Sequence, residues 1–314
     1  MHSIRFTKMH GLGNDYVYVD GFEQSLAGLD LPALSRRISD RHRGVGSDGL
    51  ILITPPSPGI TADARMEMYN ADGSRGEMCG NGIRCVGKYV VEKRHKGVAG
   101  TPGPDNAVDQ TVPLRIETDR GVLNLEAMLR EGVVNRVRVD MGRPILAPAE
   151  IPVRYEGARD RCVHAPLEVA GARLYVTCVS MGNPHAVTFV ENVAAFELER
   201  IGPLVERHPM FPNRVNYHVA QGHSPAEATM RTWERGSGIT QACGTGACAV
   251  LVAAVLEDRL SRRAMLHLPG GDLEIEWPQG DGRSGVEGHV FKTGPAEEVF
   301  RGEYSLIGPE VPKG

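Results

Sequence analysis

The chain has 314 residues, of which 41% are hydrophobic and 24% are charged, a composition typical of a globular protein with a buried core. Its formal net charge is −4 and no long run of one sign occurs, which argues against binding to nucleic acid or to a membrane surface. The first residues lack the apolar stretch of a signal peptide, and no segment approaches the ~20 apolar residues of a membrane span. We therefore expect a cytoplasmic protein, long enough for two domains.

The N-terminal part of the chain predicts short strands and one helix. Strands are expected over residues 4–9 and 16–19, on either side of a Gly-Leu-Gly-Asn-Asp turn, and over 50–54 and 65–70, with a helix over 31–39. The last of these strands leads to MCGNG at 78–82, in which Cys79 precedes a Gly-x-Gly turn. Apolar residues then recur with helical spacing from Ile83 to Val91. The stretch 97–110, rich in Gly, Pro, Asp and Asn, predicts an exposed loop.

The second half repeats this order of elements. Strands are expected over 114–118, 123–127, 136–140, 172–179, 186–190, 273–277, 289–293 and 298–304, and helices over 198–207 and 247–258. The second helix follows ACGTG at 242–246, so Cys243 repeats the context of Cys79. Ahead of each cysteine lies a Gly-Asn turn, with Asn14 matching Asn183. Nine residues before each cysteine stands a polar residue, Asn70 in the first half and Glu234 in the second. Three matches in one order predict a duplicated fold.

The two motif cysteines are the candidates for chemistry. A thiol at a helix N-terminus lies at the positive end of the helix dipole, so we expect both pKa values to fall below the free value of about 8.5. Duplicated halves tend to face each other across a cleft, which would place one sulfur on each side of a bound molecule. The other cysteines are expected to be buried fillers, because their spacing offers no zinc-binding pairs; they are Cys85, Cys162, Cys178 and Cys248.

Two opposed thiols suit either redox cycling or proton transfer at carbon. In the second case one thiolate removes a proton and the other thiol returns one to the opposite face, which inverts a stereocentre. No C-x-x-C pair occurs in the chain, so inversion fits better than redox cycling. The chain also shows no persuasive Schiff-base lysine with a phosphate loop, so pyridoxal phosphate is not expected. The Gly-x-Gly turns would instead offer backbone N–H groups to a carboxylate.

At this point the chain closely resembles the diaminopimelate epimerase family. The resemblance rests on GLGNDYVYVD, GVGSDG, YNADGS followed by MCGNGIRC, SMGNPHAV, FPNRVN and WERGSGITQACGTGACA, in the order and spacing of the family. It implies interconversion of LL- and meso-diaminopimelate in lysine and peptidoglycan precursor synthesis. It also implies an α/β (α+β) fold of two pseudo-symmetric domains, each a β-barrel-like mixed sheet around a central helix, with the active site in the cleft between them. We place the first domain at 1–121 plus 295–314, carrying Cys79, and the second at 122–294, carrying Cys243.

The resemblance implies a role for each matching residue. Cys79 and Cys243 would be the acid/base thiols, and His185 and Glu234 would help to set their protonation. The charged ends of the substrate would be bound by Asn14, Asn70, Asn183, Asn216, Glu234 and Arg235, since amide and guanidinium groups meet carboxylates directionally. The carboxylate at the reacting centre would meet donors from Gly80, Asn81, Gly244 and Thr245. No metal or cofactor is implied, and a homodimer is expected.

One departure and several alternatives stand beside this interpretation. In some members a glutamine that contacts substrate occupies the position of Gly49. A proline or hydroxyproline racemase usually has histidine after the first Cys-Gly, where this chain has Asn81. A phenazine-biosynthesis-type isomerase of the same fold does not keep both cysteines. A thiol redox protein, from another class, would need a disulfide in normal turnover, whereas that bond would inactivate an epimerase. Asparagines such as Asn14 also occur as plain turn residues.

Overall fold

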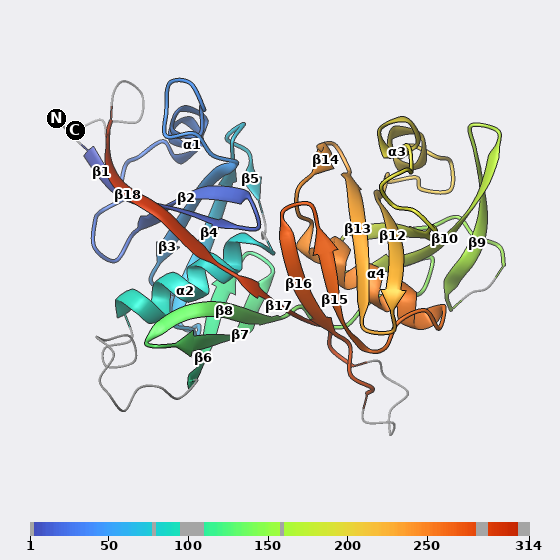
Figure 1. Ribbon diagram of the computed structural model, residues 1–314. Helices are drawn as coiled ribbons and strands as arrows, with labels where there is room; N and C mark the ends of the chain where they lie inside the picture. The colour runs from blue at the N-terminus through green and yellow to red at the C-terminus, as the bar shows by residue number, and fades with distance from the viewer. Residues whose placement is uncertain (1–2, 77–79, 95–109, 158–159, 281–287, 307–314) are drawn as a thin grey trace. The chain divides into compact units, whose positions relative to one another are not determined.

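A computed structural model describes residues 3–76, 80–94, 110–157, 160–280 and 288–306. The chain divides into two compact units, 1–139 with 294–314 and 140–293. Unit 1 contains two helices, α1 (Leu31–Ile38) and α2 (Gly82–Arg94). Its strands are β1 (Ser3–Gly11), β2 (Asn14–Asp20), β3 (Gly49–Thr54), β4 (Ala64–Asn70), β5 (Arg75–Gly76), β6 (Gln110–Thr118), β7 (Gly121–Arg130), β8 (Val133–Asp140) and β18 (Glu297–Ser305), as Figure 1 shows.

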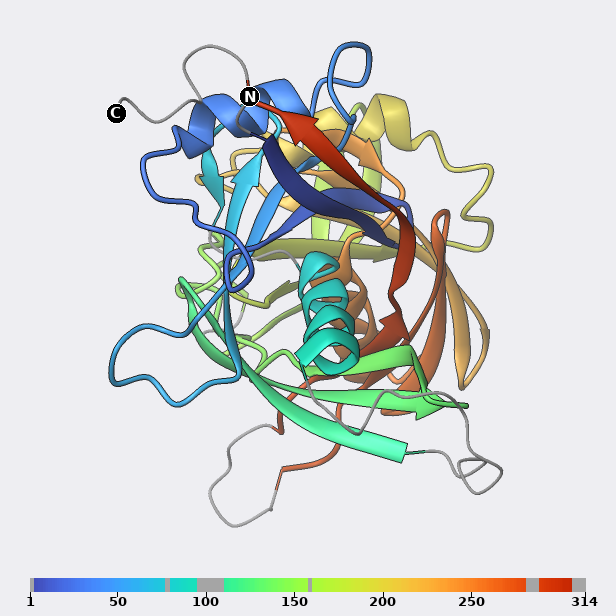
Figure 2. The same cartoon turned by 90° about the vertical axis from the view of Figure 1, so that its left-hand side faces the viewer.

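The strands of unit 1 wrap around α2. β1 pairs with β2 and with β18, β2 lies parallel to β3, and β4 continues the sheet to β6, β7 and β8. In Figure 2, β1, β2 and β18 lie on one side of α2 and β6 to β8 on the other. Ile83, Val86, Val90 and Val91 of α2 are buried, as their helical spacing predicts. The expected barrel-like sheet around a central helix is confirmed.

The helix α1 begins and ends where its sequence signals predict. The side chain of Asp30 accepts a hydrogen bond from the backbone N–H of Ala33 at 3.0 Å and caps the N-terminus. Leu34 and Ile38, one turn apart, are buried against β3 and β4. Both belong to a cluster of buried hydrophobic side chains that includes aliphatic and aromatic residues of β1, β2, β3 and β4.

Unit 2 is built from a continuous stretch of chain. Its helices are α3 (Leu198–Glu206) and α4 (Gly244–Leu256), and α4 is apolar on nearly every side and buried, as a central core helix should be. Its strands are β9 (Cys162–Val169), β10 (Ala172–Ser180), β11 (Pro184–Phe189), β12 (Asn216–Ser224), β13 (Glu227–Glu234), β14 (Gly238–Thr240), β15 (Arg263–Leu268), β16 (Gly271–Glu276) and β17 (Phe291–Pro295).

The two units share one pattern of strand pairing. β1 and β2 are antiparallel and β2 and β3 parallel; likewise β10 and β11 are antiparallel and β11 and β12 parallel. β4 lies parallel to β6, and β13 lies parallel to β15. Asn70 ends β4 and Glu234 ends β13, so the match found in the sequence joins equivalent positions. The predicted duplication is confirmed by this topology.

The structure differs from the sequence expectations in several places. We expected the first domain to extend to 121, but β7 and β8 pair with β6, so residues 122–139 group with unit 1. The second motif helix begins at Gly244 rather than at 247. The strands β5, β9, β12, β13, β14 and β15 were not predicted. The expected loop over 97–110 lies outside the described residues, except for Gln110 at the start of β6.

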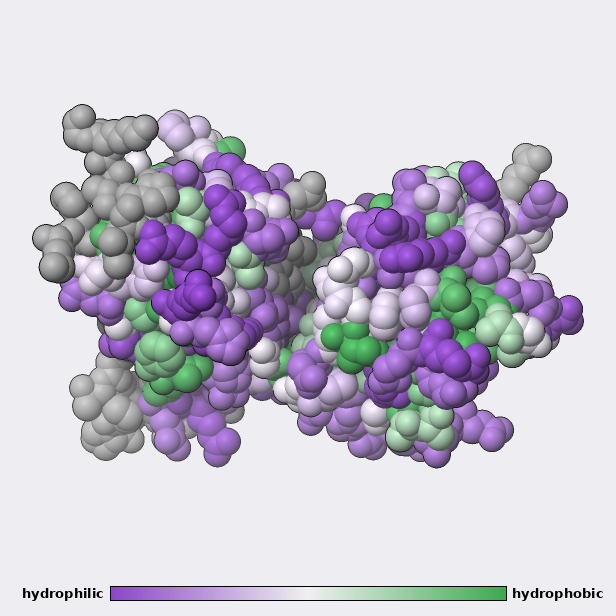
Figure 3. Space-filling model, turned by 90° about the horizontal axis from the view of Figure 1, so that it is seen from above, coloured by the Kyte–Doolittle hydropathy of each residue, from purple (hydrophilic) through white to green (hydrophobic). Residues whose placement is uncertain are grey.

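The surface of each unit carries charge with small apolar patches between. Figure 3 shows such a face, in which hydrophilic side chains predominate over separate hydrophobic spots. Of the helices in the described ranges, none combines the length and the apolar character needed to cross a membrane.

Candidate active site

Cys243 stands at the N-terminus of the central helix of unit 2. It is the N-cap residue of α4, in an extended conformation with φ −117°, and its carbonyl accepts the first helical hydrogen bond from Ala247 at 2.9 Å. Its side chain is only 5% exposed. The Sγ lies 3.7 Å from the Thr245 hydroxyl, and the backbone N–H of Gly246 also faces the sulfur. The predicted placement of a thiol at a helix N-terminus is confirmed for this half.

The expected low pKa of Cys243 is wrong for the free protein. Burial raises the pKa of this thiol well above its usual range, and the nearby Glu234 carboxylate raises it further. The Thr245 hydroxyl, the Gly246 amide and the buried Lys292 ammonium lower the pKa, but by less. The helix N-terminus was the only influence that the sequence displayed, and removal from water outweighs it here. Cys243 therefore carries its proton at neutral pH.

Glu234 is the carboxylate partner of this thiol. It ends β13, and its Oε1 accepts a hydrogen bond of 2.6 Å from the Thr240 hydroxyl. Burial raises its pKa above the ordinary value, while hydrogen bonds from Thr240 and Cys243 lower it. The Cys243 thiol thus donates a hydrogen bond to the Glu234 carboxylate, whose raised pKa makes it a better proton acceptor than an ordinary carboxylate. Proton exchange between Cys243 and Glu234 is chemically open in this arrangement.

The Asn183 and His185 side chains lie beside this centre. Asn183 precedes β11, and its Nδ2 donates to the Thr245 hydroxyl at 3.4 Å. Its Oδ1 lies 3.0 Å from His185 Nε2, and His185 Nδ1 lies 2.9 Å from His218 Nε2. Burial, together with His218 and Arg235, lowers the pKa of His185 well below its usual value. His185 is therefore a neutral hydrogen-bonding group and not a cationic acid.

Asn216 and Arg235 are joined by backbone contacts at the end of β13. The Asn216 Oδ1 accepts from the Arg235 backbone N–H at 2.9 Å, and its Nδ2 donates to the Pro184 carbonyl at 3.0 Å. Arg235 is exposed and its guanidinium donates to the Asn213 carbonyl. In unit 2 the structure therefore brings together the predicted residues Asn183, His185, Asn216, Glu234, Arg235, Cys243, Gly244 and Thr245.

In unit 1, Asn14 is held by a charged cluster. Its Nδ2 donates to Asp48 Oδ2 at 2.7 Å, and the same oxygen accepts the backbone N–H of Asp15. Arg41 binds both Asp15 and Asp48, and Lys8 forms a further ion pair with Asp15. The pKa of Asp15 lies below its ordinary value because these cations outweigh the effect of its burial. Asn14 is thus a fixed amide at the start of β2, whose preceding turn has Gly13 at φ +77°.

Asn70 ends β4 next to Gly49 of β3. Its Nδ2 donates to Ser74 Oγ at 2.9 Å, and Ser74 in turn binds Asp72. A Cβ at Gly49 would lie 2.2 Å from the Tyr69 carbonyl oxygen and 2.9 Å from the Tyr16 ring. A side chain such as glutamine therefore has no room at position 49 unless this backbone shifts, and Asn70 is the polar group at this place.

The first motif is described only from Gly80 onward, and Cys79 lies outside the described residues. Asn81 is 4% exposed, and its Oδ1 accepts from Arg84 Nη1 at 3.1 Å. The same nitrogen lies 3.3 Å from the Gly80 carbonyl, and Arg84 Nε donates to the Pro295 carbonyl at 3.0 Å. A fully buried guanidinium thus fixes the turn that carries Gly80 and Asn81 at the start of α2.

Comparison with known proteins identifies these motifs. The chain matches the family described as diaminopimelate epimerase over residues 6–147 and 177–299. The chain belongs to the diaminopimelate epimerase family. A diaminopimelate epimerase of Acetivibrio thermocellus is 48% identical over 304 residues, which cover 96% of this chain and 99% of that protein. One of Methanococcus maripaludis is 46% identical over 303 residues, 96% of this chain and 100% of that protein.

Solved structures with little sequence identity share the fold of this family member. A hydroxyproline epimerase from Agrobacterium vitis aligns with a TM-score of 0.64 at 14% identity, covering 96% of this chain and 91% of that one. A phenazine biosynthesis protein of the PhzF family from Bacillus anthracis aligns with a TM-score of 0.66 at 15% identity, covering 98% and 100%. These likenesses confirm the two-domain fold and do not extend to substrate.

Several residues that support the family motifs were not singled out from the sequence. Glu206 of α3 is 3% exposed; its carboxylate accepts from Trp233 Nε1 at 2.7 Å and from the Gly236 backbone N–H at 3.2 Å. Glu206 therefore binds the first and the last residue of the WERG segment. Arg84, Asp48 and His218 have comparable supporting positions. Arg84 and Asp48 lie within the quoted motifs, but residue type alone does not reveal burial, and His218 follows FPNRVN with no motif of its own.

Among the described residues, neither a metal-binding cluster nor a disulfide occurs. No group of three His, Cys, Asp or Glu side chains there could hold a metal ion. The remaining cysteines are buried free thiols, as expected of fillers. Cys162 and Cys178 face each other across β9 and β10, and this contact together with burial raises the pKa of Cys178 well above its usual range. Such thiols are poorly reactive.

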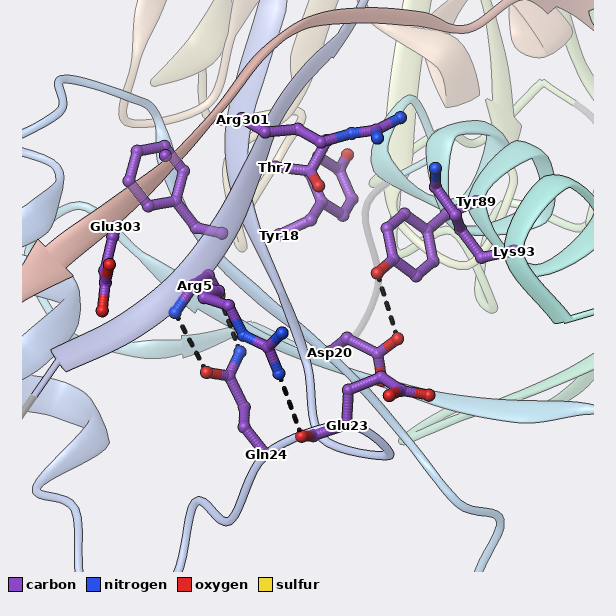
Figure 4. Close-up of a pocket in the computed structure, with 12 residues that line it drawn as sticks. Arg5, Thr7, Tyr18, Asp20, Glu23, Gln24, Tyr89, Lys93, Arg301 and Glu303 are labelled. Atoms are coloured by element: carbon purple, nitrogen blue, oxygen red, sulfur yellow. Dashed lines mark hydrogen bonds between the residues drawn. The ribbon is translucent and has the colours of Figure 1, made fainter.

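A surface hollow of about 520 Å³ in unit 1 lies away from all the predicted site residues. It is lined by β1, β2, α2, β18 and the segment after β2, and hydrogen bonds join Arg5 to Glu23 and Gln24 and Tyr89 to Asp20 (Figure 4). Tyr89 donates to Asp20 at 3.0 Å, and Arg5 exchanges hydrogen bonds with Gln24 through its backbone. None of the predicted site residues lines the hollow, so it is not part of the candidate site.

Stability of the family member should fall in mild acid because of its buried histidines. Burial lowers the pKa of His218 to about 3, whereas an unfolded histidine titrates near 6.5. Between these values the unfolded chain binds a proton that the folded chain does not, so unfolding becomes easier as pH falls below about 6.5. We expect His218→Gln to reduce this dependence by about 1 kcal/mol per pH unit. Urea unfolding of both proteins at pH values from about 5 to 7.5 measures it; equal slopes would contradict it.

Proposed function

We propose that this protein interconverts LL- and meso-diaminopimelate without a cofactor, with Cys79 and Cys243 as the acid/base thiols. The observation that carries the proposal is the Cys243 site. There a buried thiol at a helix N-terminus meets the Glu234 carboxylate and the donors of Thr245 and Gly246. A thiol in such surroundings can give up and recover a proton without any change of oxidation state. The assignment of diaminopimelate as the substrate follows from membership of the diaminopimelate epimerase family.

Inversion removes one proton from the substrate and adds another, so the reaction needs one thiolate and one thiol. The thiolate takes the α-proton from one face of the substrate as the thiol gives its proton to the opposite face. Because burial keeps Cys243 protonated in the free protein, we assign it the role of proton donor in the first turnover, with Cys79 as the base. The two thiols exchange protonation states with each inversion, so the product leaves an enzyme ready for the reverse reaction. Resetting without substrate requires Cys243 to regain a proton and Cys79 to lose one, and we assign Glu234 as the group through which Cys243 regains its proton.

The other predicted residues supply binding. We propose that Gly80, Asn81, Gly244 and Thr245 offer donors to the carboxylate at the reacting centre, where negative charge develops. The charged ends of the substrate are assigned to Asn14, Asn70, Asn183, Asn216 and Arg235. Support comes from how firmly these amides are held. Asn14 is fixed by Asp48 and Asn216 by backbone groups at both of its atoms, so their donors are oriented before substrate arrives.

Proton NMR in deuterated buffer tests the proposal directly. Purified protein with reductant and LL-diaminopimelate, and with no added cofactor, should produce the meso isomer with deuterium at one α-carbon. Incubation with proline or hydroxyproline should give neither inversion nor exchange. Absence of deuterium uptake from diaminopimelate, with free thiols verified by titration, would reject the assignment. Activity that requires an oxidised disulfide would instead favour the thiol redox class.

We further propose that the enzyme acts as a cytoplasmic homodimer. Free thiols are needed for the reaction, and the described cysteines are free, which suits a reducing compartment. For the dimer, support comes from β18, where Val299 is 54% exposed and Phe300 45% exposed. Two large apolar side chains exposed on one strand favour an interface at that strand. Sedimentation velocity of the full chain should show a mass of twice 34.0 kDa, and a monomer would contradict it.

A further inference from the structure

The imidazole of His218 lies directly beneath the Cys243 site, although the chemistry proposed above does not use it. His218 is in β12, with no exposed surface. A Cβ at Gly246 would lie 2.3 Å from His218 Cε1 and 3.0 Å from the Cys243 sulfur. The first turn of α4 therefore rests on this ring, and only glycine allows the approach. A buried polar ring in this place requires satisfied hydrogen bonds and an explanation.

His218 is the centre of a continuous chain of side-chain contacts. Its Nδ1 lies 3.0 Å from the Thr232 hydroxyl, and its Nε2 lies 2.9 Å from His185 Nδ1. From His185 the chain continues through Nε2 to Asn183 Oδ1 at 3.0 Å. It ends with Asn183 Nδ2 to the Thr245 hydroxyl at 3.4 Å and the Thr245 hydroxyl to Cys243 Sγ at 3.7 Å. All six residues belong to unit 2.

The hydrogen bonds in this series all run in one direction, from Thr232 at one end towards Cys243 at the other. Asn183 Oδ1 can only accept, so His185 must carry its proton on Nε2. Burial keeps His185 neutral, so its Nδ1 is an acceptor and takes the Nε2 proton of His218. The His218 Nδ1 then accepts from Thr232. At the other end, Asn183 donates to the Thr245 oxygen, which leaves the Thr245 proton free to point at the sulfur.

We propose that His218 is a positioning residue, which fixes the tautomer of His185 and the amide of Asn183 so that the Thr245 hydroxyl donates to Cys243. Without the His218 proton, His185 could carry its own proton on Nδ1, and its Nε2 would then face Asn183 as an acceptor. The Asn183 amide would turn its nitrogen towards His185, and the Thr245 hydroxyl would lose the donor that directs its proton to sulfur. Aligned donors also strengthen one another.

The hydrogen bond from the Thr245 hydroxyl stabilises the thiolate that Cys243 becomes when it has given its proton away. The groups that face the sulfur are Glu234 from β13, Lys292 from β17 and the Gly246 amide and Thr245 hydroxyl from α4. Glu234 disfavours the thiolate, while the other three favour it. Of these three, the hydroxyl is the group whose proton direction the series of contacts sets. This inference rests on the proposed function only for the role of Cys243, and the thiol can be measured with no substrate present.

Alkylation of Cys243 by iodoacetamide provides the test. Below the pKa, the rate at fixed pH is proportional to the thiolate fraction, and fragmentation of the modified peptide in the mass spectrometer distinguishes Cys243 from Cys248 and Cys79. We expect His218→Leu to slow the reaction about 10-fold between pH ~7 and ~9, as loss of one donor to a charged sulfur implies. His218→Gln, whose amide can donate to His185 Nδ1, should stay within about 3-fold of the wild type.

A double-mutant comparison separates positioning from a general loss of packing. Thr245→Val should slow alkylation by the same ~10-fold, and adding His218→Leu should slow it no further, because both variants remove the same donation. Thr188→Val, which removes a buried hydroxyl of β11 outside the chain of contacts, should leave the rate unchanged. Additive effects of the two variants, or a wild-type rate in folded His218→Leu, would overturn the proposal.

A measurement on the wild type covers the case in which a variant fails to fold. Nitrogen-15 NMR of the histidine rings distinguishes a protonated from an unprotonated ring nitrogen. We expect His185 to carry its proton on Nε2 and His218 to carry its proton on Nε2. A proton on His185 Nδ1 would overturn the proposal without any substitution. Neither experiment measures epimerase activity. A failure of this inference can therefore be told apart from a failure of the proposed function.

Discussion

Replacement of Cys243 by alanine is expected to lower the rate of inversion of diaminopimelate by about 10³-fold, in the range typical of a lost general acid or base. The physical reason is that Cys243 alone among the described cysteines stands at a helix N-terminus beside a carboxylate and oriented donors. Cys79→Ala should have the same effect, since inversion needs a proton taken from one face and another delivered to the opposite face. NMR of the α-protons in deuterated buffer measures both inversion and exchange.

The matched control for this variant is Cys248→Ala on the same helix. Cys248 is fully buried one turn further along α4, where its thiol serves as a small apolar filler. Its replacement should leave the rate of inversion within about 3-fold of wild type. If Cys243→Ala keeps near-normal turnover, or if both variants lose activity together, the two-base scheme fails.

Gly246→Ala is expected to lower activity by about 10²-fold and to destabilise the fold by about 1–3 kcal/mol. The new Cβ would lie 2.3 Å from His218 Cε1, 2.9 Å from His218 Nε2 and 3.0 Å from the Cys243 sulfur. Both neighbours are buried, so the helix or the ring must move. Alanine favours a helix over glycine by up to about 1 kcal/mol, so a loss of stability here would run against intrinsic propensity. Urea unfolding and steady-state kinetics measure the two effects.

Gly222→Ala is the corresponding control. Gly222 lies in β12 with no atom near the position that its Cβ would take. The substitution should change the free energy of unfolding by less than about 0.5 kcal/mol, as is usual for surface positions. Unchanged stability and activity in Gly246→Ala would show that the first turn of α4 can move freely off His218, and would contradict the close approach described here.

The parts of this protein that the sequence predicts are those with local signals. The helical spacing from Ile83 to Val91 and the Gly-x-Gly turns place α2 and α4, and the Asn70–Glu234 match reveals the duplication. The strands β12 and β13 escaped prediction, although they carry Asn216 and Glu234. Residues 216–220 of β12 are all buried, so both faces of the strand lie in the interior. This segment therefore lacks the alternation of buried and exposed residues by which a strand is recognised in a sequence.

The electrostatics of the site could not be predicted from local sequence. Cys243 has the expected helix N-terminus, yet its pKa rises because burial and Glu234 are properties of the folded unit. His218 and Arg84 show the same limit: each is fully buried, and its partners come from distant segments, as Pro295 does for Arg84. A charged residue type predicts exposure on average, and only the fold reveals the exceptions.

The duplicated halves differ at one equivalent position in a way that bears on the reaction. Where β4 ends with the neutral amide of Asn70, β13 ends with the carboxylate of Glu234. Two identical halves would give their thiols equal affinity for a proton. The carboxylate of Glu234 raises the pKa of Cys243, and no carboxylate stands at the equivalent end of β4.

The pairing of β1 with β18 also has a consequence for biosynthesis. Ser3 lies opposite Ser305, so unit 1 is assembled from the two ends of the chain, whereas unit 2 is continuous. A ribosome releases the N-terminal strands first, and β1 must then wait for almost the whole chain before its last partner exists. The last strand of unit 2, β17, emerges only shortly before β18, but contacts within the continuous unit 2 join residues closer in sequence than Ser3 and Ser305, and contacts between distant residues form slowly. We therefore expect unit 2 to be the first stable intermediate of the nascent protein, with unit 1 closing last.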